Sequence, residues 1–417
     1  MLHQIPTDRY GPLGQPMADA VQACVHCGFC LAACPTYDLL GQEMDSPRGR
    51  IVLMKQVLEG QVTFADAQPH VDRCLGCLAC EPACPSGVPY RDLISPFRAL
   101  AVAEVRRGPW ERLRRFLAAR TLPFPARFRL AAWLGGTRLA RRLAPRPLRP
   151  MLDLIPAVLP PRQSWAEVNA ARGPRRARVA LLTGCAQQVL EPDITAATIA
   201  VLTSEGVEVV VPRGQGCCGG LAWHTGDLTA ARGFARRNID AFPADVDAIV
   251  TTAAGCGSAM HEYHLVLRGT PDESRAEAFR RRVVDVTAFL ATLGLRGSLR
   301  ETRLKAAYQD ACHLAHAQGV RSPPRELLRS IPGLELVEIA DPHLCCGSAG
   351  TYNLDQPEIA ATLGERKARA ILATGADVAV TGNIGCLMQV RMHLGRLGST
   401  IPVRHTMQVL RDAVADA

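Results

Sequence analysis

The sequence lacks the long hydrophobic runs and leader patterns that would place the chain in or across a membrane. None of its 417 residues lie in a stretch approaching the roughly 18 consecutive apolar residues that a membrane-spanning helix needs. The opening MLHQIPTDRYGPLGQP shows no basic segment followed by an apolar one, as a secretory signal does. We therefore expect a cytoplasmic protein. A mean hydropathy of +0.04 fits a globular chain of two or three domains.

A flavin or nicotinamide fingerprint is also absent. The stretch GQGCCG at residues 214–219 formally satisfies G-x-G-x-x-G after an apolar run. That motif needs a βαβ unit with an acidic residue about twenty residues further on. Here two variable positions are cysteines, and the corresponding stretch later in the chain, DPHLCCGSAG, lacks the pattern. We therefore expect hydride removal from a substrate to occur in another subunit.

Positive charge is concentrated in one segment of a chain whose net charge is +9. Residues 106–149 contain thirteen arginines, no lysine and a single acidic residue, Glu111. Aromatic residues are interleaved with the arginines: Trp110, Phe116, Phe124, Phe128 and Trp133. Basic helices with aromatic anchors lie on anionic membranes, and the alternative is a connector that packs between domains or against partner subunits. No nucleic-acid motif accompanies the arginines, so we expect no nucleic-acid partner.

Sixteen cysteines are the feature that packing alone does not explain. A cytoplasmic chain keeps its thiols reduced, which argues against disulfides, and buried free cysteines would be scattered along the sequence. All sixteen instead form four sets: Cys24, Cys27, Cys30, Cys34; Cys74, Cys77, Cys80, Cys84; Cys185, Cys217, Cys218, Cys256; and Cys312, Cys345, Cys346, Cys386. Such grouping indicates metal ligation.

The first two sets match C-x2-C-x2-C-x3-C-P, the ferredoxin run that binds [4Fe–4S] clusters. In two-cluster proteins the fourth cysteine of each run ligates the other cluster. We therefore assign one cluster to Cys24, Cys27, Cys30 and Cys84, and the other to Cys74, Cys77, Cys80 and Cys34. Structural zinc is the alternative, because paired C-x-x-C motifs often bind it.

A helix is expected between the two runs. Ser46-Pro47 is typical of a helix start, and the following RGRIVLMKQVLEG has helical apolar spacing up to a glycine stop. Arg48 and Arg50 either moderate the negative charge of a cluster or form a solvated first turn. The whole stretch resembles the α-helical ferredoxin modules of fumarate-reductase-type iron–sulfur subunits.

The second half of the chain is an internal duplication. Corresponding cysteines of the third and fourth sets are offset by 127, 128, 128 and 130 residues. Short strand-like runs before the cysteines alternate with helical stretches, which predicts parallel α/β units. The cysteines should then lie beyond the carboxyl ends of the strands, where open α/β sheets hold their ligands.

These inferences define an α+β multidomain protein with four parts. We expect a dicluster ferredoxin domain at 1–100, an arginine-rich helical connector at 101–175, and repeated α/β domains at 176–300 and 301–417.

The repeats resemble the cysteine-rich CCG domains of heterodisulfide reductases and of several quinone-linked dehydrogenases. The full family form ends in C-x-x-C, whereas this chain has Ala259 and Gln389 at the last position. That departure argues against five-cysteine noncubane clusters, but the four cysteines of each repeat are candidates for a further cluster, with zinc or an empty thiol pocket as alternatives. The nearby His224, His313 and His316 are expected to be hydrogen-bonded loop residues, as is His343.

Over its whole length the chain resembles the iron–sulfur subunits of glycolate dehydrogenase, also called glycolate oxidase. The stretches CVHCGFCLAACPTYDLLGQEMDSPRGRIVLMKQVLEG and PRGQGCCGGLAWHTG carry the resemblance. It implies FAD-containing partner subunits that oxidise glycolate to glyoxylate, and electron transfer through this chain to membrane quinone at the inner face of the cytoplasmic membrane. Alternatives are the equivalent subunit of a glycerol-3-phosphate or D-lactate dehydrogenase, heterodisulfide reductase-like thiol chemistry, and a zinc-stapled interaction module.

Overall fold

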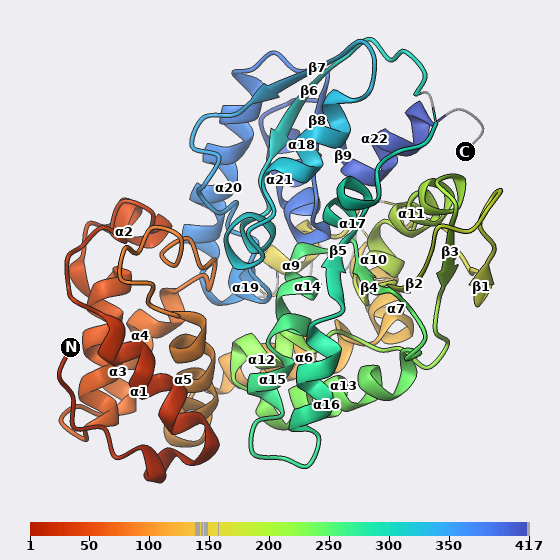
Figure 1. Ribbon diagram of the computed structural model, residues 1–417. Helices are drawn as coiled ribbons and strands as arrows, with labels where there is room; N and C mark the ends of the chain where they lie inside the picture. Colours follow the sequence, from red (N-terminus) through yellow and green to blue (C-terminus); the bar gives the residue numbers. More distant parts are fainter. Residues whose placement is uncertain (138–141, 143–144, 146–148, 157, 298, 415–417) are drawn as a thin grey trace.

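The computed structural model describes residues 1–137, 142, 145, 149–156, 158–297 and 299–414. A helical N-terminal module, a helical connector and two α/β units follow one another along the chain (Figure 1). Part of the predicted connector, at 138–141, 143–144 and 146–148, lies outside the described residues. None of the described helices is long and apolar enough to cross a membrane.

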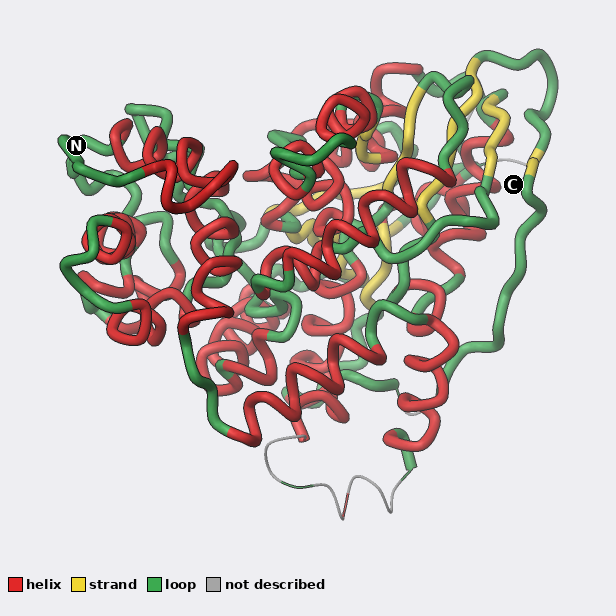
Figure 2. Tube along the Cα trace, turned by 90° about the horizontal axis from the view of Figure 1, so that it is seen from below, coloured by secondary structure: helices red, strands yellow, loops and turns green. Residues whose placement is uncertain are grey.

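The N-terminal module is wholly helical and stands to one side of the strands (Figure 2). Ser46 caps α3 as the sequence predicts, because its hydroxyl accepts a hydrogen bond from the Gly49 amide at 2.9 Å. Met17, Met54 and Phe97 are fully buried in the module core. Its elements are η1 (Thr7–Leu13), α1 (Gly14–Ala23), α2 (Pro35–Leu40), η2 (Glu43–Asp45), α3 (Pro47–Leu58), α4 (Phe64–Arg73) and α5 (Arg91–Glu104).

The described connector contains α6 (Pro109–Thr121), α7 (Pro125–Gly135) and α9 (Arg149–Asp153). Proline opens both α6 and α7 at the first turn, where its missing amide hydrogen costs nothing. The predicted limit at residue 100 falls inside α5, and β1 (Val168–Asn169) pairs with the first sheet although it lies before residue 175. The exact domain limits stay predictions.

The first α/β unit holds a five-stranded sheet in the order β1-β3-β2-β4-β5, parallel except for β1. Its remaining strands are β2 (Ala177–Leu182), β3 (Val207–Val210), β4 (Ala248–Thr251) and β5 (Val283–Asp285). Its helices are α10 (Gln187–Leu190), α11 (Asp193–Ser204), α12 (Gly220–Thr225), α13 (Leu228–Ala241), α14 (Ala254–His261), α15 (Tyr263–Val266), α16 (Glu273–Arg280) and α17 (Val286–Leu293).

The second unit holds a four-stranded parallel sheet in the order β7-β6-β8-β9. Its strands are β6 (Leu304–Gln309), β7 (Leu334–Glu338), β8 (Val378–Thr381) and β9 (Val403–His405). Its helical elements are η4 (His313–Ala317), α18 (Ser322–Arg329), α19 (Tyr352–Asp355), α20 (Pro357–Leu372), α21 (Ile384–Arg396) and α22 (Thr406–Ala413). The duplication extends to strand order, since β2, β3, β4 and β5 correspond to β6, β7, β8 and β9.

The two units share one apolar core rather than touching at polar surfaces. Helix α22 of the second unit packs on α11 of the first, and α17 packs on α18. Valine and leucine side chains of α11 join Met407 and Leu410 in a single buried cluster. At its edge Asp193 accepts hydrogen bonds from Arg411 at 2.6 Å and Gln408 at 2.8 Å. The relative placement of the two cysteine sets is therefore fixed by burial.

Gly347, directly after the second cysteine pair, provides a test of how tightly α20 packs within the second α/β unit. Its φ is +85°, and a Cβ there would lie 2.6 Å from the Ala360 carbonyl oxygen of α20. We expect Gly347→Ala to lower the melting temperature by at least about 6 °C, because left-handed strain and overpacking act together. Gly398→Ala is the matched control, since Gly398 has φ +75° with nothing within 4 Å of a Cβ. A loss of about 2–4 °C is expected there, and equal losses would contradict the packing argument.

Candidate metal centres

Both ferredoxin-type runs begin where a helix ends. Helix α1 ends directly before Cys24, and α4 ends directly before Cys74. The amide of each first cysteine donates a hydrogen bond to a carbonyl in the last turn of the preceding helix, Cys24 to Val21 and Cys74 to Val71, with a distance of 3.2 Å in both cases. The two loops therefore leave equivalent helices in the same way, as expected for a duplicated cluster-binding motif.

The two loops also share one backbone path. Left-handed residues occur two and four positions after the first cysteine: His26 and Gly28 in one loop, with φ of 58° and 87°, and Gly76 and Leu78 in the other, with φ of 63° and 59°. Glycine occupies the second of the two left-handed positions in the first loop and the first of them in the second loop. A side chain in this conformation costs about 1–2 kcal/mol, so His26 and Leu78 hold strain of the kind that functional sites retain.

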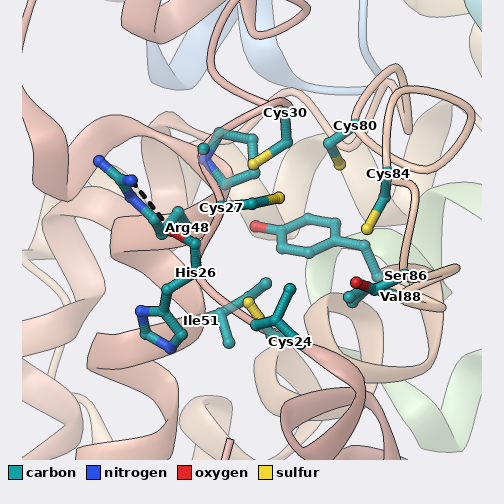
Figure 3. Close-up of a pocket in the computed structure, with 14 residues that line it drawn as sticks. Cys24, His26, Cys27, Cys30, Arg48, Ile51, Cys80, Cys84, Ser86 and Val88 are labelled. Carbon is teal, nitrogen blue, oxygen red and sulfur yellow. Dashed lines mark hydrogen bonds between the residues drawn. The ribbon is translucent and has the colours of Figure 1, made fainter.

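The first run encloses a pocket together with the end of the second run. The pocket is lined by Cys24, Cys27, Cys30 and Cys84, with Cys80 at its edge, and has an empty volume of about 410 Å³. Figure 3 shows these five cysteines arranged around the space. Three thiols thus come from one loop and the fourth from beyond the other.

The second run encloses the complementary pocket. Cys34, Cys74, Cys77 and Cys80 line a space with an empty volume of about 310 Å³. The structure therefore brings together the two crossed quartets that the sequence predicts. Cys80 borders both pockets, so the two spaces adjoin.

Four thiols around a compact space are the donor set of a [4Fe–4S] cluster. Among the described residues, no three His, Cys, Asp or Glu side chains come close enough to hold a single metal ion. Burial is the main cause that raises the pKa of Cys77 and of Cys80 well above the usual value for a thiol, and neighbouring thiols add to the effect. Metal ligation requires deprotonated thiols, so the binding of a positively charged metal centre would offset the cost of deprotonating these buried side chains. The residues present fit the predicted cluster, and ligation itself stays a prediction.

Arg50 is a buried cation beside the second pocket, so a solvated helix start is the wrong interpretation for it. Its side chain is 1% exposed, and its guanidinium lies 3.8 Å from Cys34 Sγ. It donates hydrogen bonds to Thr36 Oγ1 at 3.0 Å and to the His70 carbonyl at 2.7 Å. Asp45, itself fully buried, lies 3.5 Å away as its counter-ion.

The charge of Arg50 favours thiolate at the second pocket. Burial raises the pKa of Cys74, but Arg50 and Arg98, together with hydrogen bonds from the Gly76 amide and the Tyr90 hydroxyl, leave its pKa below the usual value. Arg48 differs, because it is partly exposed, pairs with Glu43 at 2.7 Å and donates to the His26 carbonyl at 3.2 Å. Sequence reasoning did not distinguish the two arginines, which lie two residues apart on one helix.

The cysteines of the first α/β unit meet beyond the carboxyl ends of β2, β3 and β4, as predicted. Cys185 Sγ lies 3.5 Å from Cys217 Sγ. The pKa of Cys218 falls well below its usual value, because Cys217 and Cys256 donate hydrogen bonds to it. The Gly220 amide also points to Cys218 Sγ, at 3.5 Å. The four thiols of the set thus lie close to one another.

The second unit repeats this arrangement with deeper burial. Cys312 Sγ lies 3.9 Å from Cys345 Sγ, and Asn383 Nδ2 donates to Cys386 Sγ at 3.3 Å. Cys345, Cys346 and Cys386 are all buried. The structure therefore gathers all eight later cysteines into two sets, one for each repeat.

The positions of the missing fifth cysteines are filled by other buried residues. Ala259 is 1% exposed in α14, and Gln389 is fully buried in α21. Gln389 Nε2 donates to the Ala360 carbonyl at 3.1 Å. Neither position offers a sulfur ligand.

The second cysteine set packs directly against the ferredoxin module, a contact that no sequence signal announces. Leu75, Cys77, Cys312 and Cys345 belong to one buried cluster. His313 Nε2 lies 2.9 Å from the Gly76 carbonyl oxygen and so joins the two units. This loop histidine is hydrogen-bonded as expected, but its partner lies more than 200 residues away in the sequence.

A large cavity lies where the module, the connector and both α/β units meet. It has an empty volume of about 1530 Å³, and its walls include Cys74, Cys185, Cys218, Cys256 and Cys312. His224 and His313 also line it, with ring centroids 5.6 Å apart. Within the described residues, His224 Nε2 and His313 Nδ1 are buried without a hydrogen-bond partner. Sequence reasoning did not find this cavity.

Comparison with known proteins agrees with the two kinds of cysteine site. Residues 20–88 match a 4Fe-4S dicluster domain, and residues 179–261 and 306–391 match a cysteine-rich domain named CCG. A solved structure of a hypothetical protein from Helicobacter pylori covers 98% of this chain and 73% of its own, with a TM-score of 0.55 and 10% identity. That likeness concerns the fold alone. Together these features define an iron–sulfur protein with a dicluster module and duplicated cysteine-rich domains.

Two curated relatives span nearly the whole chain. The glycolate oxidase iron-sulfur subunit of Escherichia coli K12 is 38% identical over 403 residues, 95% of each chain. The probable glycolate oxidase iron-sulfur subunit of Bacillus subtilis 168 is 37% identical over 413 residues, 94% of this chain and 93% of its own. The chain belongs to the family of glycolate oxidase iron–sulfur subunits.

The crossed quartets predict which cluster each fourth cysteine supports. Cys34→Ser should damage the cluster of the second pocket and reproduce the EPR spectrum of Cys77→Ser, with a loss of at most about four irons per chain. Cys84→Ser is the matched control and should reproduce the spectrum of Cys27→Ser. If Cys34→Ser instead matched Cys27→Ser, the crossed assignment would be wrong.

The buried Arg50 predicts a shift in redox potential at one cluster only. Arg50→Gln removes a positive charge beside Cys34 and should make the potential of the second cluster about 50–90 mV more negative, equivalent to about 1–2 kcal/mol. Arg48→Gln, which removes a partly exposed charge two residues away, should leave that potential unchanged. Potentiometric titration followed by EPR measures both, and equal shifts would contradict a specific role for Arg50.

Proposed function

We propose that this chain is the electron-transfer subunit of a flavin-dependent glycolate dehydrogenase complex. It takes electrons from reduced FAD in a partner subunit, where glycolate is oxidised to glyoxylate, and passes them towards membrane quinone. The names of the two full-length relatives support the substrate and the complex. The observation that carries the relay itself is an unbroken series of thiol sites from the surface to the interior.

The series begins at the first pocket, which lies at the surface. Cys27 is exposed, and the flanking Val25 and Phe29 are 65% and 68% exposed. Exposed apolar side chains around a redox ligand are typical of a contact surface for another protein. We therefore place the entry of electrons from the flavin subunit at the loop of residues 24–30.

The series continues inward through shared and touching cysteines. Cys80 borders both N-terminal pockets, and Cys77 of the second pocket packs with Cys312 and Cys345 of the second repeat. Electrons entering at the first cluster would thus pass the second cluster and reach the second cysteine-rich repeat. This order follows from packing, since Leu75 and Cys77 at the second pocket pack with residues of the second α/β unit, whereas Cys27 at the first pocket is exposed.

Each part of the chain has a defined task in this relay. [4Fe–4S] clusters, when bound, supply one-electron transfer at potentials set by charge, hydrogen bonds and solvent exposure. Cys24, Cys27, Cys30 and Cys84 hold one cluster, and Cys74, Cys77, Cys80 and Cys34 hold the other. Arg50 supplies buried positive charge beside Cys34. Tyr90 lines both pockets, and its hydroxyl lies 3.7 Å from Cys74 Sγ, so it excludes water between the two sites.

The later cysteines are proposed as ligands of a further cluster. The second set has the stronger claim, because three of its four cysteines are buried and it packs in one cluster with Cys77 of the second pocket. The ligands proposed are Cys312, Cys345, Cys346 and Cys386 in that set, and Cys185, Cys217, Cys218 and Cys256 in the first.

A second candidate function is thiol–disulfide chemistry at the cysteine-rich repeats. A fumarate reductase (CoM/CoB) subunit of Methanothermobacter marburgensis is 34% identical over 240 residues, 57% of this chain and 47% of its own. The buried Ala259 and Gln389 at the positions of the missing cysteines count against it. A disulfide-dependent oxidation of reduced protein would support this function, and its absence would leave electron relay.

Iron and acid-labile sulfide, measured on anaerobically purified protein, test the cofactor content. About eight irons per chain correspond to two [4Fe–4S] clusters, and about twelve or more place a further cluster in the repeats. Little iron with stoichiometric zinc would contradict the relay. With the partner flavoprotein present, glycolate should generate the EPR signals of reduced clusters, whereas D-lactate and glycerol-3-phosphate should not. Reduction by either of those substrates alone would reassign the complex.

A further inference from the structure

Helix α6 of the connector turns its charged face towards the protein. Arg114 Nη1 donates to the Leu354 carbonyl at 2.6 Å, and Arg115 lies 3.2 Å from Glu111 and 3.7 Å from Asp355. These contacts fix the helix to α19 of the second α/β unit. A surface helix of a globular protein ordinarily does the reverse and buries its apolar face.

The opposite face of α6 is apolar and exposed. Trp110, Leu113, Phe116 and Leu117 recur at helical spacing on one side. Helix α7, which packs against α6, adds Leu130, Trp133 and Leu134 while it buries Phe128 and Ala132. We call the seven exposed side chains the outer apolar face; they are 36–64% exposed. Exposed apolar groups gathered in this way mark a surface that another phase or molecule covers.

The exposed charges that α6 and α7 themselves carry have one sign. Arg112, Arg120 and Arg127 are exposed at its margin. The guanidinium of Arg120 lies 5.4 Å from the ring centroid of Phe116. Glu111, the one acidic residue of the segment 106–149, is turned inward between Arg107 and Arg115. Whatever covers this surface must therefore accept positive charge beside apolar and aromatic side chains.

We propose that the outer apolar face of α6 and α7 binds an anionic lipid surface, with the two helices lying in the plane of the membrane. Tryptophan and leucine side chains enter the headgroup region, and the arginines neutralise lipid phosphates. A lipid surface fits better than a protein partner, because the apolar side chains and arginines occur without an exposed acidic residue of the segment among them.

This orientation places the cavity between the domains next to the lipid. Arg107, Arg115 and Leu122 of the same connector form part of the cavity wall. The connector therefore presents one side to the membrane and the other to the space bordered by Cys74 and Cys312. A lipid-soluble electron acceptor would have a short path to that space. This last consequence rests on the proposed function, whereas lipid binding does not.

Sedimentation with lipid vesicles tests the proposal on the full-length, cluster-loaded chain. We expect the protein to bind vesicles of phosphatidylcholine mixed with phosphatidylglycerol, to bind phosphatidylcholine alone much more weakly, and to be released by high salt. The double variant Trp110→Ser/Trp133→Ser should lower the partition coefficient at least about tenfold. Val168→Ser is the matched control, since Val168 is a 51% exposed apolar side chain on β1, and it should bind as the wild type does.

Charge is tested separately. Arg112→Glu and Arg120→Glu should each lower binding to the anionic vesicles at least about fivefold. Arg303→Glu, at an arginine that is 90% exposed on the second α/β unit, serves as the control and should change binding little. Unchanged iron content and visible spectrum in every variant show that the chain has folded.

Three results would overturn the proposal. The first is equal binding to neutral and anionic vesicles, and the second is full binding by the double tryptophan variant. The third is a wild-type protein that does not bind vesicles, together with a double variant that loses association with the flavoprotein or with a second copy of the chain. That combination would make the outer apolar face a protein interface. None of these measurements uses glycolate turnover, so they fail independently of the proposed function.

Discussion

The exchange of the fourth cysteine between the two N-terminal runs is the constraint on which the rest of the structure depends. Each pocket is closed by a thiol that lies beyond the other loop, Cys84 for the first and Cys34 for the second. Neither loop therefore forms a complete site alone. Because the second pocket also packs against the second α/β unit, the exchange couples the surface loop to the interior of the molecule.

A buried ion network holds this arrangement in place. The fully buried Asp45 lies 3.0 Å from His70 and from Arg73, and 3.5 Å from Arg50. Its partners come from α3 and α4, so one carboxylate ties both helices to η2. A buried charge of this kind is costly unless it is paired, and a network of partners offsets the cost. The network fixes the position of Arg50, which faces the thiols of the second pocket.

Much of the candidate site could be predicted because its cysteines recur at short, regular intervals along the sequence. The two ferredoxin runs, the crossed quartets and the duplicated cysteine sets all follow from intervals along the chain, and the strand-like runs indicated the parallel sheets. What escaped prediction depends on residues far apart in sequence. Arg50 and Arg48 look alike locally, yet only Arg50 meets Asp45 and Cys34. The contact of Cys77 with Cys345 and the cavity between the domains arise from domain packing, which leaves no periodic signal. For the segment of α6 the sequence left two interpretations open, membrane contact and packing between domains, because composition does not tell which side of a helix is buried.

The duplicated units illustrate how equal sequence patterns acquire unequal surroundings. Both repeats place four cysteines beyond the carboxyl ends of corresponding strands. In the second repeat, Cys312 and Cys345 touch the ferredoxin loop, and His313 bonds to its backbone. In the first, Cys185, Cys218 and Cys256 border the cavity, whose wall also includes Cys74 and Cys312. The second repeat thus meets the N-terminal module both by direct packing and at the cavity, whereas the cysteines of the first repeat face the module only through the cavity among the described residues. The shared core of the two units fixes this difference, because α11 and α22 cannot separate without exposing buried apolar surface. The asymmetry therefore belongs to the fold itself, and it gives the two repeats different surroundings although their cysteine spacing is nearly the same.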